Sequence, residues 1–196
     1  MSKFDVAELE KTACRRWNIG CGEWKIAYWT NVDSDPNIEA DIHATIPPIP
    51  AETESLDQIW ACHFLEHLGP GEAQIFLREA YRCLVPGGRL GIVVPDTKEV
   101  MRRYLAGAID QVEYPYRQWH AVADLDDVCA LFLYSTVQES PHRWSYDIDT
   151  LARALTRAGF VGLREIDRYR DGLIAHGAWY QFGIYSFKPK DKEEGG

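Results

Sequence analysis

A glycine turn near the start of the chain, followed by an aspartate eleven positions later, constrains the fold more than any other feature. The turn is Asn18-Ile19-Gly20-Cys21-Gly22, and the aspartate ends the stretch Thr30-Asn31-Val32-Asp33. Each closes a short apolar segment that is predicted to be a strand. The carboxyl ends of parallel strands meet at one edge of a sheet. The turn and Asp33 are therefore expected to form two walls of one site at that edge.

The rest of the sequence alternates strand and helix patterns, which predicts an α/β fold with a parallel sheet. Apolar stretches predict six strands, at 16–19, 29–33, 58–63, 89–94, about 162–168 and about 178–187. A helix is predicted from Gly69-Pro70-Gly71-Glu72 to the breaker Pro86-Gly87-Gly88, because apolar residues recur between them at helical spacing. A second helix is predicted over 147–158, with Asp147 or Asp149 as N-cap and Gly159 at its end.

Length and charge limit the class of protein. The 196 residues suffice for one domain, placed at 15–188 between an N-terminal extension at 1–14 and a disordered tail at 189–196. A net charge of −9 argues against nucleic acid as a partner, because such binding needs clustered Lys and Arg. No apolar run is long enough for a membrane span, and no signal peptide is visible, so a cytoplasmic location is expected.

Residues 114–146 are the least regular stretch of the domain, yet they are rich in aromatic residues. A linker would be mostly polar, so the stretch is predicted to be an insertion that packs over the sheet, or a lid. The five cysteines show no C-x-x-C spacing, and they are expected to be reduced.

The glycine turn and Asp33 have the chemistry that a nucleoside requires. Glycines let the backbone approach a ligand where a Cβ would collide, and a carboxylate can accept from both hydroxyls of a ribose. A tight turn at Gly20 and a cap at Asp33 are the structural alternatives. A dinucleotide dehydrogenase is disfavoured, because Gly20-Cys21-Gly22-Glu23-Trp24-Lys25 lacks the third glycine of that fingerprint.

Six motifs in order resemble the class I S-adenosylmethionine-dependent methyltransferases, over about 15–187. They are Gly20-Cys21-Gly22, Asn31-Val32-Asp33, Ala40-Asp41-Ile42-His43, 59–68 with His63-Phe64-Leu65-Glu66-His67, 84–90, and 142–160. The sequence is most similar to small predicted methyltransferases associated with sugar and polysaccharide pathways. Two features depart from the usual pattern of the class. The first motif has Asn18 in place of an acidic residue and Trp24 in place of a third glycine, and the first helix is shortened.

The resemblance implies a Rossmann-like sheet of seven strands, mostly parallel with the last strand antiparallel, and helices on both faces. It also implies S-adenosylmethionine as the cofactor. The implied cofactor contacts are Gly20, Cys21 and Gly22 to the aminocarboxypropyl end, Asp33 to the ribose, Asp41 and Ile42 to the adenine, and Cys62 and His63 to the methionine part.

Histidines are the candidate catalytic residues. If the methyl acceptor is a hydroxyl, a general base must receive its proton, and His63, His120 and His142 are candidates. Asp96 is a carboxylate alternative, although a helix-cap role is favoured for it. Two histidines and a glutamate at the spacing of His63, Glu66 and His67 can resemble a metal site. The glutamate lies in the wrong place for H-E-x-x-H and the sequence signals no further protein ligand nearby, so no metal site is predicted and a structural role is favoured for His67.

The sequence thus predicts a methyltransferase that acts on a small-molecule acceptor, such as a sugar or metabolite hydroxyl. The sugar comes from the family association alone. The alternative is a catalytically silent methyltransferase-like domain that binds the cofactor or a protein partner. No motif indicates the oligomeric state.

Overall fold

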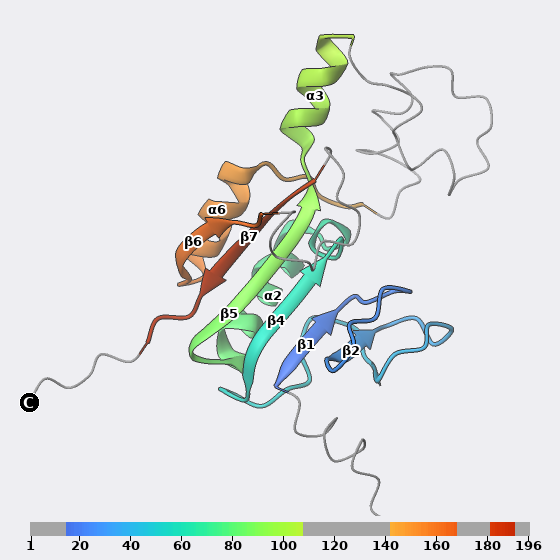
Figure 1. The fold of residues 1–196 in the computed structure, drawn as a ribbon, viewed down its shortest axis with the longest axis vertical. Helices are drawn as coiled ribbons and strands as arrows, with labels where there is room; N and C mark the ends of the chain where they lie inside the picture. Colours follow the sequence, from blue (N-terminus) through green and yellow to red (C-terminus); the bar gives the residue numbers. More distant parts are fainter. Residues whose placement is uncertain (1–14, 108–141, 168–180, 191–196) are drawn as a thin grey trace, which may run out of the picture.

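Seven strands form a single sheet in the order β3-β2-β1-β4-β5-β7-β6 (Figure 1). The computed structural model describes residues 15–107, 142–167 and 181–190. The strands are β1 Arg16–Ile19, β2 Thr30–Asp33, β3 Ile42–His43, β4 Leu56–Cys62, β5 Leu84–Pro95, β6 Val161–Glu165 and β7 Gln181–Phe187. The strands β1 to β5 pair in parallel, and β7 lies antiparallel between β5 and β6. The prediction of a seven-stranded sheet with its last strand reversed is confirmed.

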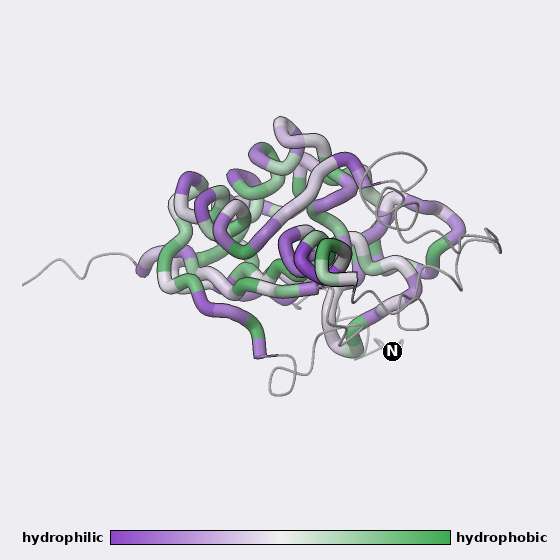
Figure 2. The backbone as a smooth tube through the Cα atoms, turned by 90° about the horizontal axis from the view of Figure 1, so that it is seen from above, coloured by the Kyte–Doolittle hydropathy of each residue, from purple (hydrophilic) through white to green (hydrophobic). Residues whose placement is uncertain are grey.

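The predicted helices are present, and local capping explains where they begin. Helix α2 (Pro70–Cys83) starts after Gly69, whose N–H donates to Glu72 Oε2 at 2.8 Å. The apolar residues that recur at helical spacing are buried: Ala73, Phe76, Leu77 and Ala80. In Figure 2 hydrophobic and hydrophilic residues alternate along the helical turns, as expected of amphipathic helices.

Two aspartates cap the other α-helices that the structure describes. The N–H of Thr150 donates to Asp147 Oδ1 at 2.7 Å, which identifies Asp147 rather than Asp149 as the N-cap of α6 (Ile148–Arg157). The N–H of Glu99 donates to Asp96 Oδ1 at 3.0 Å at the start of α3 (Thr97–Leu105), so the cap role favoured for Asp96 is confirmed.

The two faces of the sheet are covered differently. Helices α2 and α6 pack on one face, in a core that includes Phe76, Leu155 and Ile92. The opposite face has a second buried cluster, formed by Trp29, Trp60, Val93, Ile166 and Tyr185. Helices were predicted on this face too. Within the described residues this face is covered by the β1–β2 connection, which contains turns and no helix. About ten residues join these strands, too few for a helix and its return.

Buried amide side chains hold the β1–β2 connection in place of a helix. The side chain of Asn31 accepts from Ile26 N at 2.9 Å and donates to the carbonyls of Ile26 and Trp29 at 3.2 and 3.1 Å. Asn18 Nδ2 donates to Asn31 Oδ1 at 3.0 Å and to Trp24 O at 2.9 Å. A carboxylate at position 18 could not donate, so the departure from the usual acidic residue has a structural reason.

Several sequence predictions lie outside the described residues. These are the N-terminal extension at 1–14, positions 114–141 of the insertion, and positions 191–196 of the tail. Among the helices that the structure does describe, none has the length and apolar character needed to cross a membrane.

We expect Asn31→Ala to lower the free energy of unfolding by about 2–4 kcal/mol, because it removes the hydrogen bonds of a buried side chain with backbone groups of Ile26 and Trp29 and with Asn18. Urea denaturation measures this change. The matched control is Asn37→Ala, since the Asn37 side chain makes an exposed contact with Asp35. An equal loss in the two variants would contradict the role assigned to Asn31.

Candidate functional site

The glycine turn and Asp33 form one hydrogen-bonded unit at the carboxyl edge of β1 and β2. Gly20 and Gly22 have φ of 66° and 49°, in the left-handed region that favours glycine. The N–H of Gly20 donates to Val32 O at 2.8 Å, and that of Gly22 donates to Asp33 Oδ2 at 2.8 Å. The two predicted walls of the site are therefore joined directly.

The two glycines differ in what surrounds them. A Cβ on Gly20 would lie 2.4 Å from Cδ2 of Phe64, whereas a Cβ on Gly22 would meet no atom within 4 Å. Gly20 thus packs against the segment that follows β4, and Gly22 borders open space. That open space beside a carboxylate is consistent with a ligand at the turn.

The predicted cofactor residues lie along the sheet edge in strand order. Ile42 begins β3, Asp33 ends β2, the glycine turn follows β1, and Cys62 ends β4. Asp33 Oδ1 also accepts from Asp35 N at 3.0 Å. Each carboxylate oxygen can accept more than one hydrogen bond, so these contacts are compatible with the predicted ribose contact.

Asp41 and Cys21 have structural functions in this arrangement. Asp41 Oδ2 accepts from the backbone N–H of Asn31 at 2.9 Å and from its side chain at 3.2 Å. The contact of Asp41 with an adenine stays a prediction. Burial, with the nearby charge of Asp33, raises the pKa of Cys21 to about 11. Cys21 is therefore a protonated packing residue and not a nucleophile.

We expect Gly20→Ala to weaken S-adenosylmethionine binding and to destabilise the domain more than Gly22→Ala does. Both variants force an alanine into the left-handed region at a cost of about 1–2 kcal/mol. Only Gly20→Ala also displaces Phe64. Thermal unfolding and calorimetric titration of the two variants measure the difference. A larger destabilisation by Gly22→Ala would contradict this account.

His63 lies just past the end of β4 in a strained conformation. Its φ is 52°, which is uncommon for a residue with a side chain, and its N–H donates to Val93 O at 2.9 Å. The imidazole Nδ1 lies 3.0 Å from Glu66 Oε1, and Nε2 lies 2.7 Å from Gln181 Oε1. Strained residues cluster at functional sites, because the surrounding structure must support their cost.

Glu66 and His63 form a buried charged pair. Burial by itself would lower the pKa of His63, but the hydrogen bond and charge of Glu66 raise it above the ordinary value. Burial would likewise raise the pKa of Glu66, but the hydrogen bond and charge of His63 lower it. Both ring nitrogens of His63 face acceptor oxygens, so the cationic form is favoured.

A segment distant in the sequence completes this group. The N–H groups of Arg143 and Trp144 donate to the carbonyl of Glu66, in the short 3-10 helix η1 (Leu65–His67), at 2.7 and 3.1 Å. His142 Nε2 lies 4.0 Å from Glu66 Oε1, and the His142 ring packs edge to face against His67, with centroids 4.9 Å apart. His63 and His142 are thus brought together on Glu66, whereas His120 lies outside the described residues.

Sequence reasoning missed the central position of Glu66 and the contribution of Gln181. Glu66 lies between His63 and His67 in a motif that the sequence analysis recognised, and this position was the available signal. Gln181 is the first residue of β7, and no pattern connects it with His63. The expectation of no metal ligand set rested on sequence neighbours, and the fold adds His142 to Glu66 and His67.

Comparisons with known proteins agree with this geometry. Residues 18–92 match a family model described as a methyltransferase domain. A possible histamine N-methyltransferase from Thermotoga maritima aligns with a TM-score of 0.58 and 16% identity, covering 89% of this chain and 82% of that chain. A methyltransferase from Archaeoglobus fulgidus aligns with a TM-score of 0.56 and 14% identity, covering 93% and 90%. No curated protein sequence gives a significant match.

A further structural match carries the cofactor. Phosphoethanolamine N-methyltransferase 2 from Haemonchus contortus, solved with S-adenosyl-L-methionine, aligns with a TM-score of 0.53 and 15% identity, over 94% of this chain and 52% of that one. The fold of this chain is that of these methyltransferases, and its residues 18–92 carry the match to the methyltransferase domain. The family model and the fold agree with the class and the cofactor that the sequence predicts.

Proposed function

We propose that this chain transfers a methyl group from S-adenosylmethionine to a hydroxyl of a small-molecule acceptor. One observation carries the proposal: the joined glycine turn and Asp33 lie at the same sheet edge as the group formed by His63, Glu66 and His142. The first unit has the chemistry to hold the nucleoside end of a cofactor. The second provides imidazoles and a carboxylate for an acceptor that must lose a proton.

The fit of the cofactor rests on residues of this chain. Gly22 borders open space, and the Asp33 carboxylate stands directly beside it. The cofactor supplies an activated methyl group, so the protein's main task is to position the acceptor and exclude water. Cys62 ends β4 and His63 follows it, and β4 lies next to β1 in the sheet, so the methionine end would lie here beside the turn.

The chain's charge supports a small acceptor rather than nucleic acid. Its net charge of −9 opposes binding of a phosphate backbone. A hydroxyl acceptor needs a group that receives its proton, and His63 and His142 are the candidates for that role. His63 could fill it only in its neutral form, after losing the proton that Glu66 favours on its ring. Asp96 is less suited, because its carboxylate caps α3.

The absence of a helix between β1 and β2 favours a second candidate, a silent cofactor-binding module. In most α/β sites the helix after the glycine turn directs its N-terminus toward the ligand. Here residues 20–29 form turns, so that contribution is missing. Turnover separates the two candidates: release of S-adenosylhomocysteine with a panel of hydroxyl acceptors supports the enzyme, and cofactor binding without any turnover supports the module.

We expect Asp33→Asn to weaken S-adenosylmethionine binding by about tenfold or more, because it replaces a charged acceptor of the ribose hydroxyls with a neutral amide. Isothermal titration calorimetry measures the change. Asp57→Asn is the matched control, since Asp57 is exposed and lies near the opposite, amino end of β4. Unchanged binding in Asp33→Asn would refute the assigned cofactor site.

Once an acceptor is known, we expect substitution of the catalytic base to lower kcat by about 10²–10⁴-fold with little change in cofactor affinity. His63→Gln and His142→Gln are the variants to compare. His43→Gln is the control, because His43 is an exposed residue of β3. Full kcat in both test variants would remove histidine base catalysis from the proposal.

A further inference from the structure

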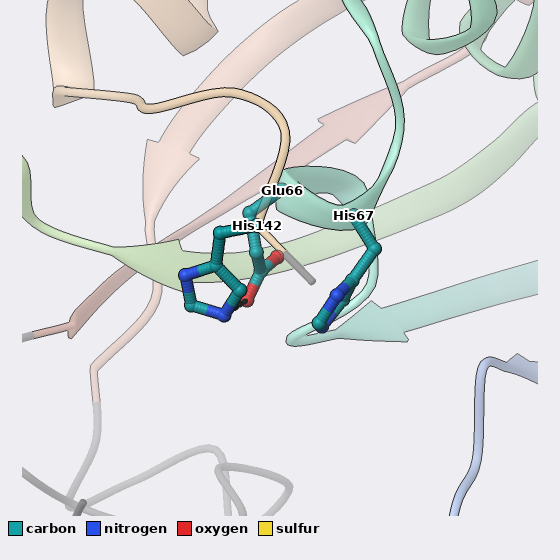
Figure 3. A group of neighbouring side chains, drawn as sticks. All are labelled: Glu66, His67 and His142. Atoms are coloured by element: carbon teal, nitrogen blue, oxygen red, sulfur yellow. Dashed lines mark ion pairs between the residues drawn. The ribbon is translucent and has the colours of Figure 1, made fainter. Parts of the chain in front are cut away.

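A cluster of ligand-type side chains lies beside the proposed methyl-transfer site. We propose that Glu66, His67 and His142 form a binding site for a divalent transition-metal ion. One candidate ligand atom of each residue lies within 4.8 Å of those of the other two. In Figure 3 the carboxylate of Glu66 lies between the two imidazole rings. Such ions take ligands at about 2.0–2.2 Å, so the three atoms would draw closer together around a bound ion.

The carboxylate of Glu66 provides the observation that points to a ligand. Its side chain is only 1% exposed. One oxygen, Oε1, lies 3.0 Å from Nδ1 of His63, whereas Oε2 is buried and has no hydrogen-bond partner among the residues that the structure describes. An unsatisfied buried polar atom is rare and costly, and it requires an explanation. A cation coordinated by Oε2 would supply the missing interaction.

The surrounding structure already holds the ligands in position. The backbone N–H groups of Arg143 and Trp144 donate to the Glu66 carbonyl, which fixes the segment that carries His142 against η1. The Arg143 side chain also pairs with Glu72 of α2. His63 orients the carboxylate through Oε1, as residues behind a metal ligand commonly do.

The donor set indicates the kind of ion. Two imidazole nitrogens and one carboxylate oxygen suit borderline ions such as Zn²⁺, Fe²⁺ or Mn²⁺ better than Ca²⁺, which prefers oxygen ligands throughout. Three protein ligands leave a coordination position open for water or substrate. On the proposed function, that position would take the acceptor oxygen, and His142 would then serve as a ligand and not as the base.

Calorimetric titration of the chelator-treated full chain with Zn²⁺ tests the site. We expect one ion per chain, and we expect His67→Ala and His142→Ala each to weaken binding by at least about 100-fold, beyond the effect usual for residues behind the ligands. His43→Ala changes an exposed histidine outside the cluster and should leave the affinity unchanged. No stoichiometric binding by the wild-type chain, or unchanged affinity in both test variants, overturns the inference.

Two further measurements keep the test decisive. If a variant does not fold, the unfolding midpoint of the wild type and of His43→Ala is measured with Zn²⁺ and then with EDTA. A reversible rise of the midpoint with Zn²⁺ supports the site, and no rise refutes it.

Parallel titration with S-adenosylmethionine separates the two proposals. A chain that binds this cofactor but no ion refutes only the metal site. One that binds the ion but neither binds the cofactor nor releases S-adenosylhomocysteine refutes only the proposed function.

Discussion

The side chain of Asn31 sets the shape of the cofactor end of the site. It satisfies backbone groups of Ile26 and Trp29, and it receives a hydrogen bond from Asn18. A helix would satisfy its own backbone groups, but a short connection must find partners elsewhere. Because Asn31 supplies them from inside the sheet, the glycine turn and Asp33 keep their positions without a helix behind them. The position of Asp33, the predicted ribose-binding carboxylate, therefore depends on the amide side chain of Asn31 two residues earlier in the same strand.

Glu66 has the same organising role at the other end of the site. Its carboxylate meets His63, and its carbonyl receives the amides of Arg143 and Trp144, so it joins the end of β4 to a segment far along the chain. A buried carboxylate is unfavourable unless it is paired. The surrounding histidines lower this cost. The same arrangement places titratable groups beside the strand end where the reacting part of a cofactor is expected.

Local patterns in the sequence predicted much of the fold and one part of the candidate site. Helix α2, the caps at Asp147 and Asp96, and the link between the glycine turn and Asp33 follow from residues close in sequence, whose spacing determines their neighbours. Strand β3 has two residues, too few for a periodic signal. The contacts of Glu66 with His142, and of His63 with Gln181, join distant segments, and no local pattern encodes such a pairing. The hydrogen bonds of Asn31 depend on a loop path that composition does not determine.

The contact between His63 and Gln181 has a consequence for the order in which the protein acquires its chemistry. The two residues are 118 positions apart, and Gln181 belongs to β7, which inserts between β5 and β6. Contacts between distant residues form late, because the chain entropy lost in closing a long loop must be overcome first. A chain emerging from the ribosome can complete the glycine turn and Asp33 long before β7 is available. The capacity to hold a nucleoside should therefore precede the fully assembled imidazole group during biosynthesis.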